Sequence, residues 1–381
     1  TRFRNVTGVQ TCALPISASC EAFILGVKAG LDPSVILDVI NAGEASSSAT
    51  RNKFARSVLA GQFDFGARMA ITIKDITTSV KEAEDLGVPM WVSRAIREQW
   101  HYAISQGAAE RDGTSLITYL EKWAGVEVRA KPVAHMVPQA KNASKYMFLN
   151  VIFVCDQRWR AVLNSRLNES NKHSDLQWML VGVAPAQTVS DVVNATLRTQ
   201  RTRSTRKHQF VINLCPSTTT EARALNAMVQ AHGHSYMDAP ITGTLADAKR
   251  GELMVLASGE PANYAALLPL FKQFANRVFH VDAHPGMAQL MHQINGALFS
   301  TLFAVTCEAF VAGAKAKLTP EVMTRVMGIE TGRNAASAHI MPQQIATRRF
   351  RHGKRIAEAL NELDAVSVEA ARLGEIGRAH V

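Results

Sequence analysis

Hydrophobic and polar positions follow two different patterns along the chain. From residue 17 to about 128, and again from 286 to 374, apolar residues recur with the spacing of amphipathic helices. Between about 146 and 282, short apolar runs bounded by turn residues alternate with helical segments, which is typical of β-strands in a βαβ arrangement. The pattern therefore predicts an α/β domain flanked by two all-helical segments.

The first helical segment contains clear helix boundaries. Gly30 closes a helix that includes Ala22 and Ala29, and Asp32 caps the next helix, which has Pro33 at its first position. A turn follows at 43–48. The remaining predicted helices are Phe63–Gly87, Trp91–Gln106 and Ser115–Trp123.

The central region predicts a doubly wound parallel sheet. A helix through Leu225 and Val229 follows one of its strands after a Thr-rich turn. The predicted strands are Val151–Val154, Trp178–Val181, Phe210–Leu214, Met254–Ala257 and Val278–Val281.

The two helical segments are copies of one unit. Glu21 and Glu308 are 287 positions apart, and the alignment runs without a gap to Gly87 and Gly374. Roughly twenty of 68 aligned positions are identical, and about a dozen others, such as Ile73 and Leu360, exchange one apolar residue for another. One copy can therefore be compared with the other.

Both ends of the chain resemble translated sequencing adapters. Thr7–Ile16 is similar to the translation of a common library adapter, and Ile376–Val381 is similar to the same adapter on its complementary strand. We exclude about 1–16 and 375–381 from the sequence-based interpretation. The chain is then expected to be a fragment.

Composition excludes several functional classes. A net charge of +10 comes largely from two clusters, Arg198–Lys207 and Arg348–Arg355, but no stacking aromatics or DNA-binding motif accompany them, so nucleic-acid binding is not expected. Residues 297–314 contain Glu308 and several small polar residues, which favours a buried helix over a membrane span. The cysteines and histidines show no metal-ligand spacing, and cysteines among apolar residues fit free thiols in a reducing cytoplasm.

Three motifs resemble the β-hydroxyacid dehydrogenases, the group of 3-hydroxyisobutyrate and L-threonate dehydrogenases. Asp238–Leu253 is similar to the substrate loop of that family, DAPVSGG…A..G.L. Gly286–Gly296 is similar to its GxGxxxKxxNN helix, and the helical copies are similar to its 6-phosphogluconate-dehydrogenase-like C-terminal domain. The resemblance covers nearly all of 17–374 and implies an oxidoreductase that transfers hydride from a small 3-hydroxy acid to NAD or NADP.

The resemblance also implies the site residues. Thr242, Gly243 and Thr244 correspond to the part of the loop that holds the substrate carboxylate. Lys74 and Asp75 correspond to residues that reach toward the cofactor. The particular acid, whether hydroxyisobutyrate, threonate, glycerate or a longer sugar acid, is left open.

The sequence departs from the family at two places. The first is the phosphate-binding turn, because no GxGxxG lies between Gly125 and Gly182. Asp156, at the end of a predicted strand, is a candidate ribose-binding acid and would favour NAD; an ordinary strand-terminal Asp is the alternative. The second is the catalytic lysine, which is replaced by His292, while Asn295 is retained and Gly296 replaces the second asparagine. A histidine can act as a base, or His292 can be an ordinary helix residue.

These comparisons predict four parts. They are a first helical domain (17–128), a linker or aberrant segment (129–145), an incomplete Rossmann-like domain (146–282) and a second helical domain (283–374). A tandem fusion and a joining of two neighbouring genes by a read error both explain this order. The helical domains are expected to pair as an internal pseudo-dimer or in a homodimer. A catalytically impaired copy that serves as a dimerisation or regulatory module is the alternative function.

Overall fold

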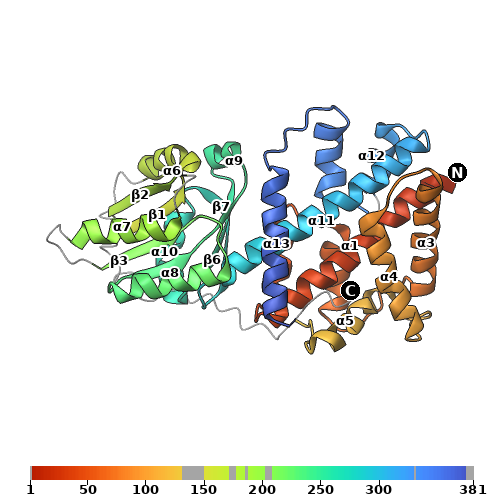
Figure 1. Cartoon of the computed structure of the whole chain (residues 1–381), viewed down its shortest axis with the longest axis horizontal. Coiled ribbons are helices and arrows are strands. Elements are labelled where there is room, and N and C mark those ends of the chain that lie inside the picture. Colours follow the sequence, from red (N-terminus) through yellow and green to blue (C-terminus); the bar gives the residue numbers. More distant parts are fainter. Residues whose placement is uncertain are drawn as a thin grey trace. The chain divides into compact units, whose positions relative to one another are not determined.

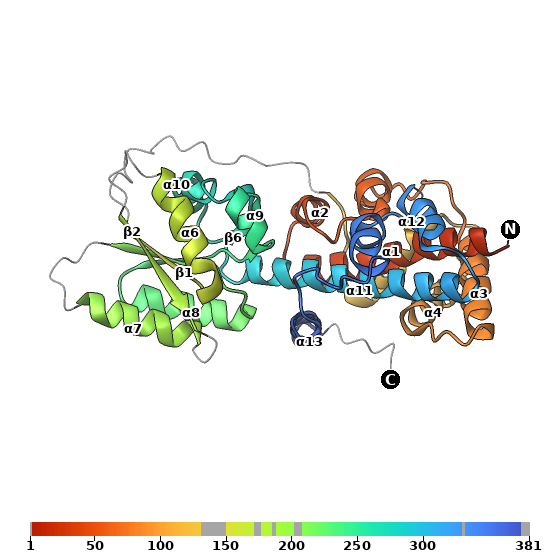
Figure 2. The same cartoon turned by 90° about the horizontal axis from the view of Figure 1, so that it is seen from above.

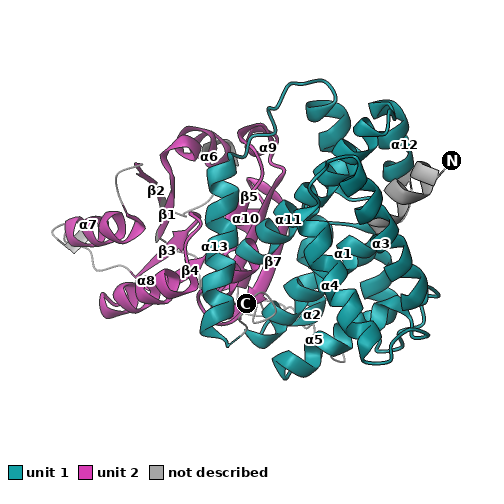
Figure 3. Ribbon diagram, turned by 45° about the vertical axis from the view of Figure 1, so that its right-hand side comes forward, with its two compact units in different colours: residues 1–133, 293–381 teal, residues 134–292 magenta. Residues whose placement is uncertain are grey.

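The computed structural model describes residues 2–130, 150–170, 177–184, 188–201, 208–329 and 332–374. The chain forms two compact units, one from residues 1–133 with 293–381 and the other from residues 134–292 (Figure 3). Unit 1 is helical and is built from both ends of the sequence. Unit 2 is the α/β domain. Most of the predicted linker and of the first basic cluster, residues 131–145 and 202–207, lies outside the described residues.

Unit 2 is built around one seven-stranded sheet with the order β2-β1-β3-β4-β6-β5, and β7 pairs with β6 (Figures 1 and 2). Strands β1 to β4 are parallel neighbours, β6 is antiparallel to both β4 and β5, and β7 is parallel to β6. All five predicted strands are present; the two short strands β4 and β5 were not predicted. The strands are β1 (Asn150–Asp156), β2 (Gln177–Val183), β3 (Gln209–Asn213), β4 (Ser235–Asp238), β5 (Ile241–Thr242), β6 (Leu253–Ser258) and β7 (Ala275–Asp282).

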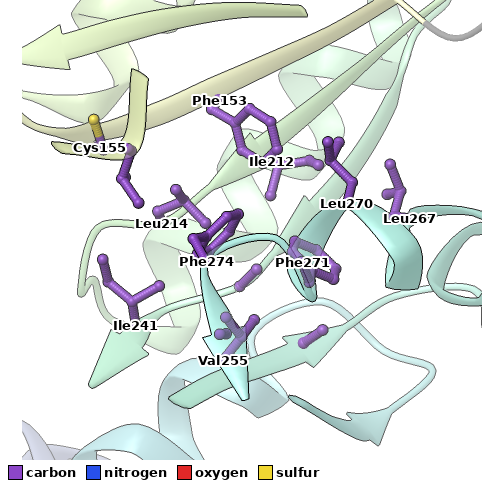
Figure 4. Packing of buried hydrophobic residues seen from close by; sticks show 14 of the residues in the cluster. Phe153, Cys155, Ile212, Leu214, Ile241, Val255, Leu267, Leu270, Phe271 and Phe274 are labelled. Carbon is purple, nitrogen blue, oxygen red and sulfur yellow. The ribbon is translucent and has the colours of Figure 1, made fainter. Parts of the chain in front are cut away.

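Alternate residues of β1 point into two separate hydrophobic cores, as the twofold period of a strand requires. Phe153 packs into the core covered by α6 and α10, where Phe271 and Phe274 also lie (Figure 4). Val154 packs into the core on the other face, against α7 and α8. This confirms the prediction of a doubly wound α/β domain. The helices of this unit are α6 (Gln157–Ser170), α7 (Val189–Arg201), α8 (Thr219–Ala231), α9 (Leu245–Arg250) and α10 (Pro261–Phe271).

Unit 1 contains the two helical repeats, and their elements recur at the same spacing of 287 residues. Helix α11 begins in unit 2 and continues into unit 1. The first repeat contains α1 (Arg2–Lys28), α2 (Pro33–Ala42), the π-helix η1 (Ala49–Val58), α3 (Met69–Asp85), α4 (Trp91–Ser105), the 3-10 helix η2 (Gly113–Leu116) and α5 (Ile117–Ala124). The second contains α11 (Met287–Lys315), α12 (Pro320–Ile329), the π-helix η4 (Ala336–Ile345) and α13 (Ile356–Arg372).

The two repeats also share unusual backbone conformations at equivalent residues. Phe63 and Phe350 both have positive φ, 52° and 49°, which is uncommon for a residue with a side chain. Gly66 and Gly353 share the same left-handed region at 113° and 101°. The helix predicted from Phe63 therefore begins only at Met69. The π-helices were not predicted, because their spacing departs from the period of an α-helix.

The two repeats contact each other inside unit 1. Ser47 forms an isolated antiparallel bridge with Asn334, which is its own equivalent position, and Ser48 N donates to Arg333 O at 2.8 Å. A position that pairs with its own equivalent lies on a local twofold axis. Helix α12 of the second repeat also packs on α1 of the first.

The terminal segment and the long apolar helix both contribute to the core. Helix α1 includes the segment that resembles an adapter, and Ala13, Leu14 and Ile16 are buried there. Among the described residues, α11 alone has the length and composition of a membrane span, and 61% of its most apolar window is buried inside the structure. This burial is typical of a core helix.

Candidate active site

The predicted substrate loop connects β4 to α9. Gly243 has a φ of 139°, and a Cβ there would lie 2.8 Å from Leu253 Cδ2, so this turn requires glycine. Thr244 caps α9: its Oγ1 donates to Asp247 Oδ2 at 2.7 Å and accepts from Asp247 N at 3.2 Å. The Thr244 hydroxyl is therefore engaged in the helix cap, whereas Thr242 faces another partner.

That partner is His292, in the second turn of α11. The distance between Thr242 Oγ1 and His292 Nδ1 is 3.2 Å, within hydrogen-bond range, and both residues are half-buried. The structure thus brings together the loop and the helix position that the family resemblance assigned to the catalytic base. A hydroxyl beside an imidazole can donate or accept, depending on which ring nitrogen carries the proton.

The first turn of α11 is anchored to the ends of β4 and β6 by two buried side chains. Asp238 Oδ1 accepts from Gly286 N at 2.9 Å, and Asp238 Oδ2 accepts from Ser258 Oγ at 2.8 Å. Ser258 Oγ in turn accepts from Ala288 N at 2.9 Å. Burial raises the pKa of Asp238 to about 6, although the bonds from Gly286 and Ser258 act in the opposite direction. These bonds fix the orientation of the helix that carries His292.

Gln289 provides a second anchor, to the turn that follows β3. Its side chain is fully buried; Oε1 accepts from Ser217 N at 2.8 Å, and Nε2 donates to Cys215 O at 3.1 Å. The sequence interpretation assigned no role to Gln289 or Ser258. The available signal was a polar residue inside an otherwise apolar run, such as Gln289 between Ala288 and Leu290.

Asp156 lies at the carboxyl end of β1. The chain moves from β1 to β2 on one side and returns to β3 on the other, so the topological switch point lies between β1 and β3. Ligands of open α/β sheets bind outside the carboxyl ends of the strands at this point. Asp156 Oδ1 accepts from Arg158 N at 2.8 Å and from Arg158 Nε at 3.0 Å.

The turn from β1 to α6 does not fit a pyrophosphate. Helix α6 begins at Gln157, directly after Asp156, with no glycine that would let the backbone approach a phosphate. The carboxylate of Asp156 also accepts a hydrogen bond from the backbone N–H of Arg158, in the first turn of this helix. Asp156 fits a ribose hydroxyl pair better than a phosphate, because a carboxylate accepts hydrogen bonds from hydroxyl groups.

The other predicted residues belong to unit 1. Lys74 lies on α3 with its side chain 73% exposed, and its Nζ is 3.8 Å from Asp75 Oδ1. Asn295 follows His292 by three residues in α11 and is buried, and its Oδ1 has no hydrogen-bond partner among the described residues. Within the described ranges, no group of three or more His, Cys, Asp or Glu side chains is placed to hold a metal ion.

This fold and these motifs are those of a family of dehydrogenases that combine an NAD-binding α/β domain with a helical domain. A family model described as the NAD-binding domain of NADP-dependent 3-hydroxyisobutyrate dehydrogenase matches residues 10–120 and 286–375, more than half of the chain. A second, the NAD binding domain of 6-phosphogluconate dehydrogenase, matches residues 157–282. The chain belongs to the β-hydroxyacid dehydrogenase family, whose cofactor is NAD or NADP.

Relatives with assigned names agree with this family. A 3-hydroxyisobutyrate dehydrogenase of Pseudomonas aeruginosa is 30% identical over 138 residues, which cover 35% of this chain and 46% of the relative. An L-threonate dehydrogenase of Escherichia coli is 27% identical over 107 residues, 28% of this chain and 35% of the relative. The chain thus spans about half or less of the length of these relatives.

A solved structure shares the fold. The 3-hydroxyisobutyrate dehydrogenase of Mycobacterium tuberculosis, solved with L-serine, matches with a TM-score of 0.50 and 19% identity, covering 60% of this chain and 88% of that protein. The match to the cofactor-domain model begins at Gln157, so β1 lies outside it. The match to the 3-hydroxyisobutyrate dehydrogenase model, which covers the two helical repeats, begins at residue 10. It thus includes part of the segment that resembles an adapter.

Proposed function

We propose that the protein is an oxidoreductase that oxidises a small 3-hydroxy acid with NAD or NADP. The observation that carries this proposal is the 3.2 Å contact between Thr242 and His292, which joins the substrate loop to the helix position of the base. Bound nicotinamide would supply the hydride acceptor. The described turn at Asp156 does not account for binding of the cofactor phosphates.

His292 is suited to the role of base. An imidazole accepts a proton near neutral pH, and a general base must lie within hydrogen-bond reach of the hydroxyl that it deprotonates. The side chain of Thr242 and the backbone of Gly243 are the groups best placed to hold the substrate carboxylate, because the Thr244 hydroxyl caps α9. Asp238 and Gln289 hold the helix that presents His292.

The substrate class follows from the relatives. Their names include 3-hydroxyisobutyrate, L-serine and L-threonate dehydrogenases, all acting on small hydroxy acids. We place the protein in the cytoplasm, because the described cysteines Cys20, Cys155, Cys215 and Cys307 are free thiols that suit a reducing compartment.

Two measurements test the proposal. Calorimetric titration of the full chain with NAD and with NADP is expected to show binding of one of them, and reduction of that cofactor at 340 nm is expected with one acid from a panel of 3-hydroxyisobutyrate, L-serine and L-threonate. His292→Asn is expected to lower kcat by about 100-fold or more while cofactor binding is retained. If neither cofactor binds, the enzyme proposal is wrong.

A second candidate is a non-catalytic pairing module. The contacts between the repeats favour it, because Ser47, on the local axis, pairs with its own equivalent Asn334. The replacement of the family's lysine by His292 and the absence of a glycine turn favour it as well. This candidate predicts a folded chain that binds neither cofactor and that associates with an active member of the family in sedimentation velocity experiments.

A further inference from the structure

One side of α11 carries further groups next to His292. An α-helix has 3.6 residues per turn, so the residues three, four and seven positions after His292 lie on the same side of α11, within an arc of about 100°. These residues are Asn295, Gly296 and Phe299. All of them belong to one continuous helix, whose rise places Phe299 about 10 Å beyond His292. We call these four residues the His292 face.

An ion pair lies against the far end of the His292 face. A Cβ at residue 296 would overlap Glu362 Oε2, so the carboxylate of Glu362 lies against the helix backbone where only glycine leaves room. Lys354 Nζ donates to Glu362 Oε2 and lies 5.8 Å from the ring centroid of Phe299. The side chains of Lys354 and Glu362 are 26% and 21% exposed. The ion pair is therefore held at Gly296 and Phe299.

The first repeat has a different arrangement at the equivalent positions. Ala67 stands where the second repeat has Lys354, and Asp75 stands where it has Glu362. The lysine beside Asp75, Lys74, has a side chain that is 73% exposed. The half-buried ion pair is thus a feature of the repeat that carries His292.

Asn295 lies between His292 and the ion pair and has an unsatisfied polar atom. It is 4% exposed, and among the described residues its Oδ1 has no hydrogen-bond partner. A buried amide oxygen without a partner is costly, and a ligand hydroxyl would supply the missing donor. The His292 face therefore offers an acceptor at Asn295, beside a donor at Lys354 and a second acceptor at Glu362.

We propose that the His292 face and its ion pair select sugar acids, whose tails carry hydroxyl groups, over hydroxy acids with an apolar tail. This inference rests on the proposed function, because it places the reacting hydroxyl at His292. A hydroxyl group both donates and accepts, so it matches a donor that lies beside two acceptors, whereas a methyl group leaves Asn295 unpaired. The ion pair has no net charge, so a tail that ends in a carboxylate fits less well, since it would meet the carboxylate of Glu362.

The test compares three four-carbon acids that differ only at the far end. L-threonate ends in a hydroxyl group, 2,3-dihydroxybutanoate ends in a methyl group, and tartrate ends in a second carboxylate. Their binding to the full chain is measured without cofactor by ligand-observed NMR titration. We expect L-threonate to bind roughly tenfold tighter than each of the other two, which is the effect of about one hydrogen bond.

Two variants change the ion pair, and a third is the matched control. Glu362→Gln keeps the shape of the side chain but leaves the charge of Lys354 unbalanced, so we expect tartrate to bind roughly tenfold tighter than L-threonate in this variant. A reversed preference cannot result from a loss of folding. Lys354→Met is expected to remove the discrimination among the acids. Arg355→Met should keep the order of the unmodified chain, because Arg355 is exposed and pairs with Glu358.

The outcomes separate this inference from the proposed function. A reversed preference in Glu362→Gln supports the inference even if no acid reduces NAD or NADP, a result that would contradict only the proposed function. If the chain oxidises hydroxy acids but binds the three acids equally, the proposed function stands and the inference is overturned. It is also overturned if none of the acids binds, if Glu362→Gln keeps the original order, or if Arg355→Met acts like Lys354→Met.

Discussion

The carboxylate of Glu308 stabilises a helix of the other repeat, and its removal should destabilise unit 1. Met90, at the N-cap of α4, makes no side-chain cap bond among the described contacts, so the helix depends on Glu308 for this role. Val92 N donates at 2.8 Å, Ser93 N at 3.1 Å and Ser93 Oγ at 2.6 Å. Glu308 is 9% exposed, so water replaces these bonds poorly.

The expected loss follows from the change in the acceptor. Glu308→Gln keeps the shape of the side chain but removes its charge and turns one acceptor oxygen into a donor. A hydrogen bond to a charged group contributes about 1.5–3 kcal/mol, and the helix dipole about 0.3–1 kcal/mol. We therefore expect the free energy of unfolding to fall by about 2–4 kcal/mol.

Urea unfolding followed by tryptophan fluorescence measures this loss, because Trp91, Trp100 and Trp123 lie on α4 and α5. With a slope of about 2 kcal/mol per M, the midpoint should move by about 1–2 M. The matched control is Glu21→Gln, at the equivalent exposed position of the first repeat, with an expected loss below about 0.5 kcal/mol. Equal losses in the two variants would refute the reasoning.

Three further changes test the anchoring of α11. Because the folded pKa of Asp238 is raised to about 6, its contribution to stability is present at low pH and is lost as pH rises from about 4 to 6. Chemical denaturation should show a loss of roughly 3 kcal/mol over this range that Asp238→Asn lacks. Gly286→Ala should destabilise unit 2 by about 2 kcal/mol, because φ is 94° and the new Cβ would lie 2.9 Å from Thr219 O. Gly233→Ala, also at positive φ but with open space around it, should cost about 1 kcal/mol. Gln289→Leu should cost about 1–3 kcal/mol in thermal unfolding, because it removes the buried hydrogen bonds to Ser217 N and Cys215 O.

The regular spacing of apolar residues and the repeat in the sequence made much of the fold predictable. Apolar runs such as Val151–Val154 indicated buried strands, and the repeat at 287 residues indicated two equivalent helical units. Local turns were less predictable, since a positive φ at Phe63 has no sequence signal comparable to a glycine. The start of α3 was therefore placed too early.

Within the candidate site, only the residues that belong to family motifs could be predicted from the sequence. The predicted substrate loop and His292 were identified from the family resemblance, and in the structure Thr242 of this loop contacts His292. Their supports, Ser258 and Gln289, were missed because their partners are backbone groups and side chains distant in sequence. The engagement of Thr244 in a helix cap was also not foreseen, although Asp247 three residues later was visible.

The bridge between Ser47 and Asn334 affects how the two repeats can accumulate amino-acid substitutions during evolution. In a symmetric pair of identical chains, every substitution at the axis occurs twice, so each new side chain must tolerate a copy of itself. With both repeats in one chain, a substitution occurs once and is tested against an unchanged neighbour. The two sides of this axis have already diverged, because one repeat has a serine there and the other an asparagine. Each repeat can therefore acquire its own substitutions while the contact between them is kept.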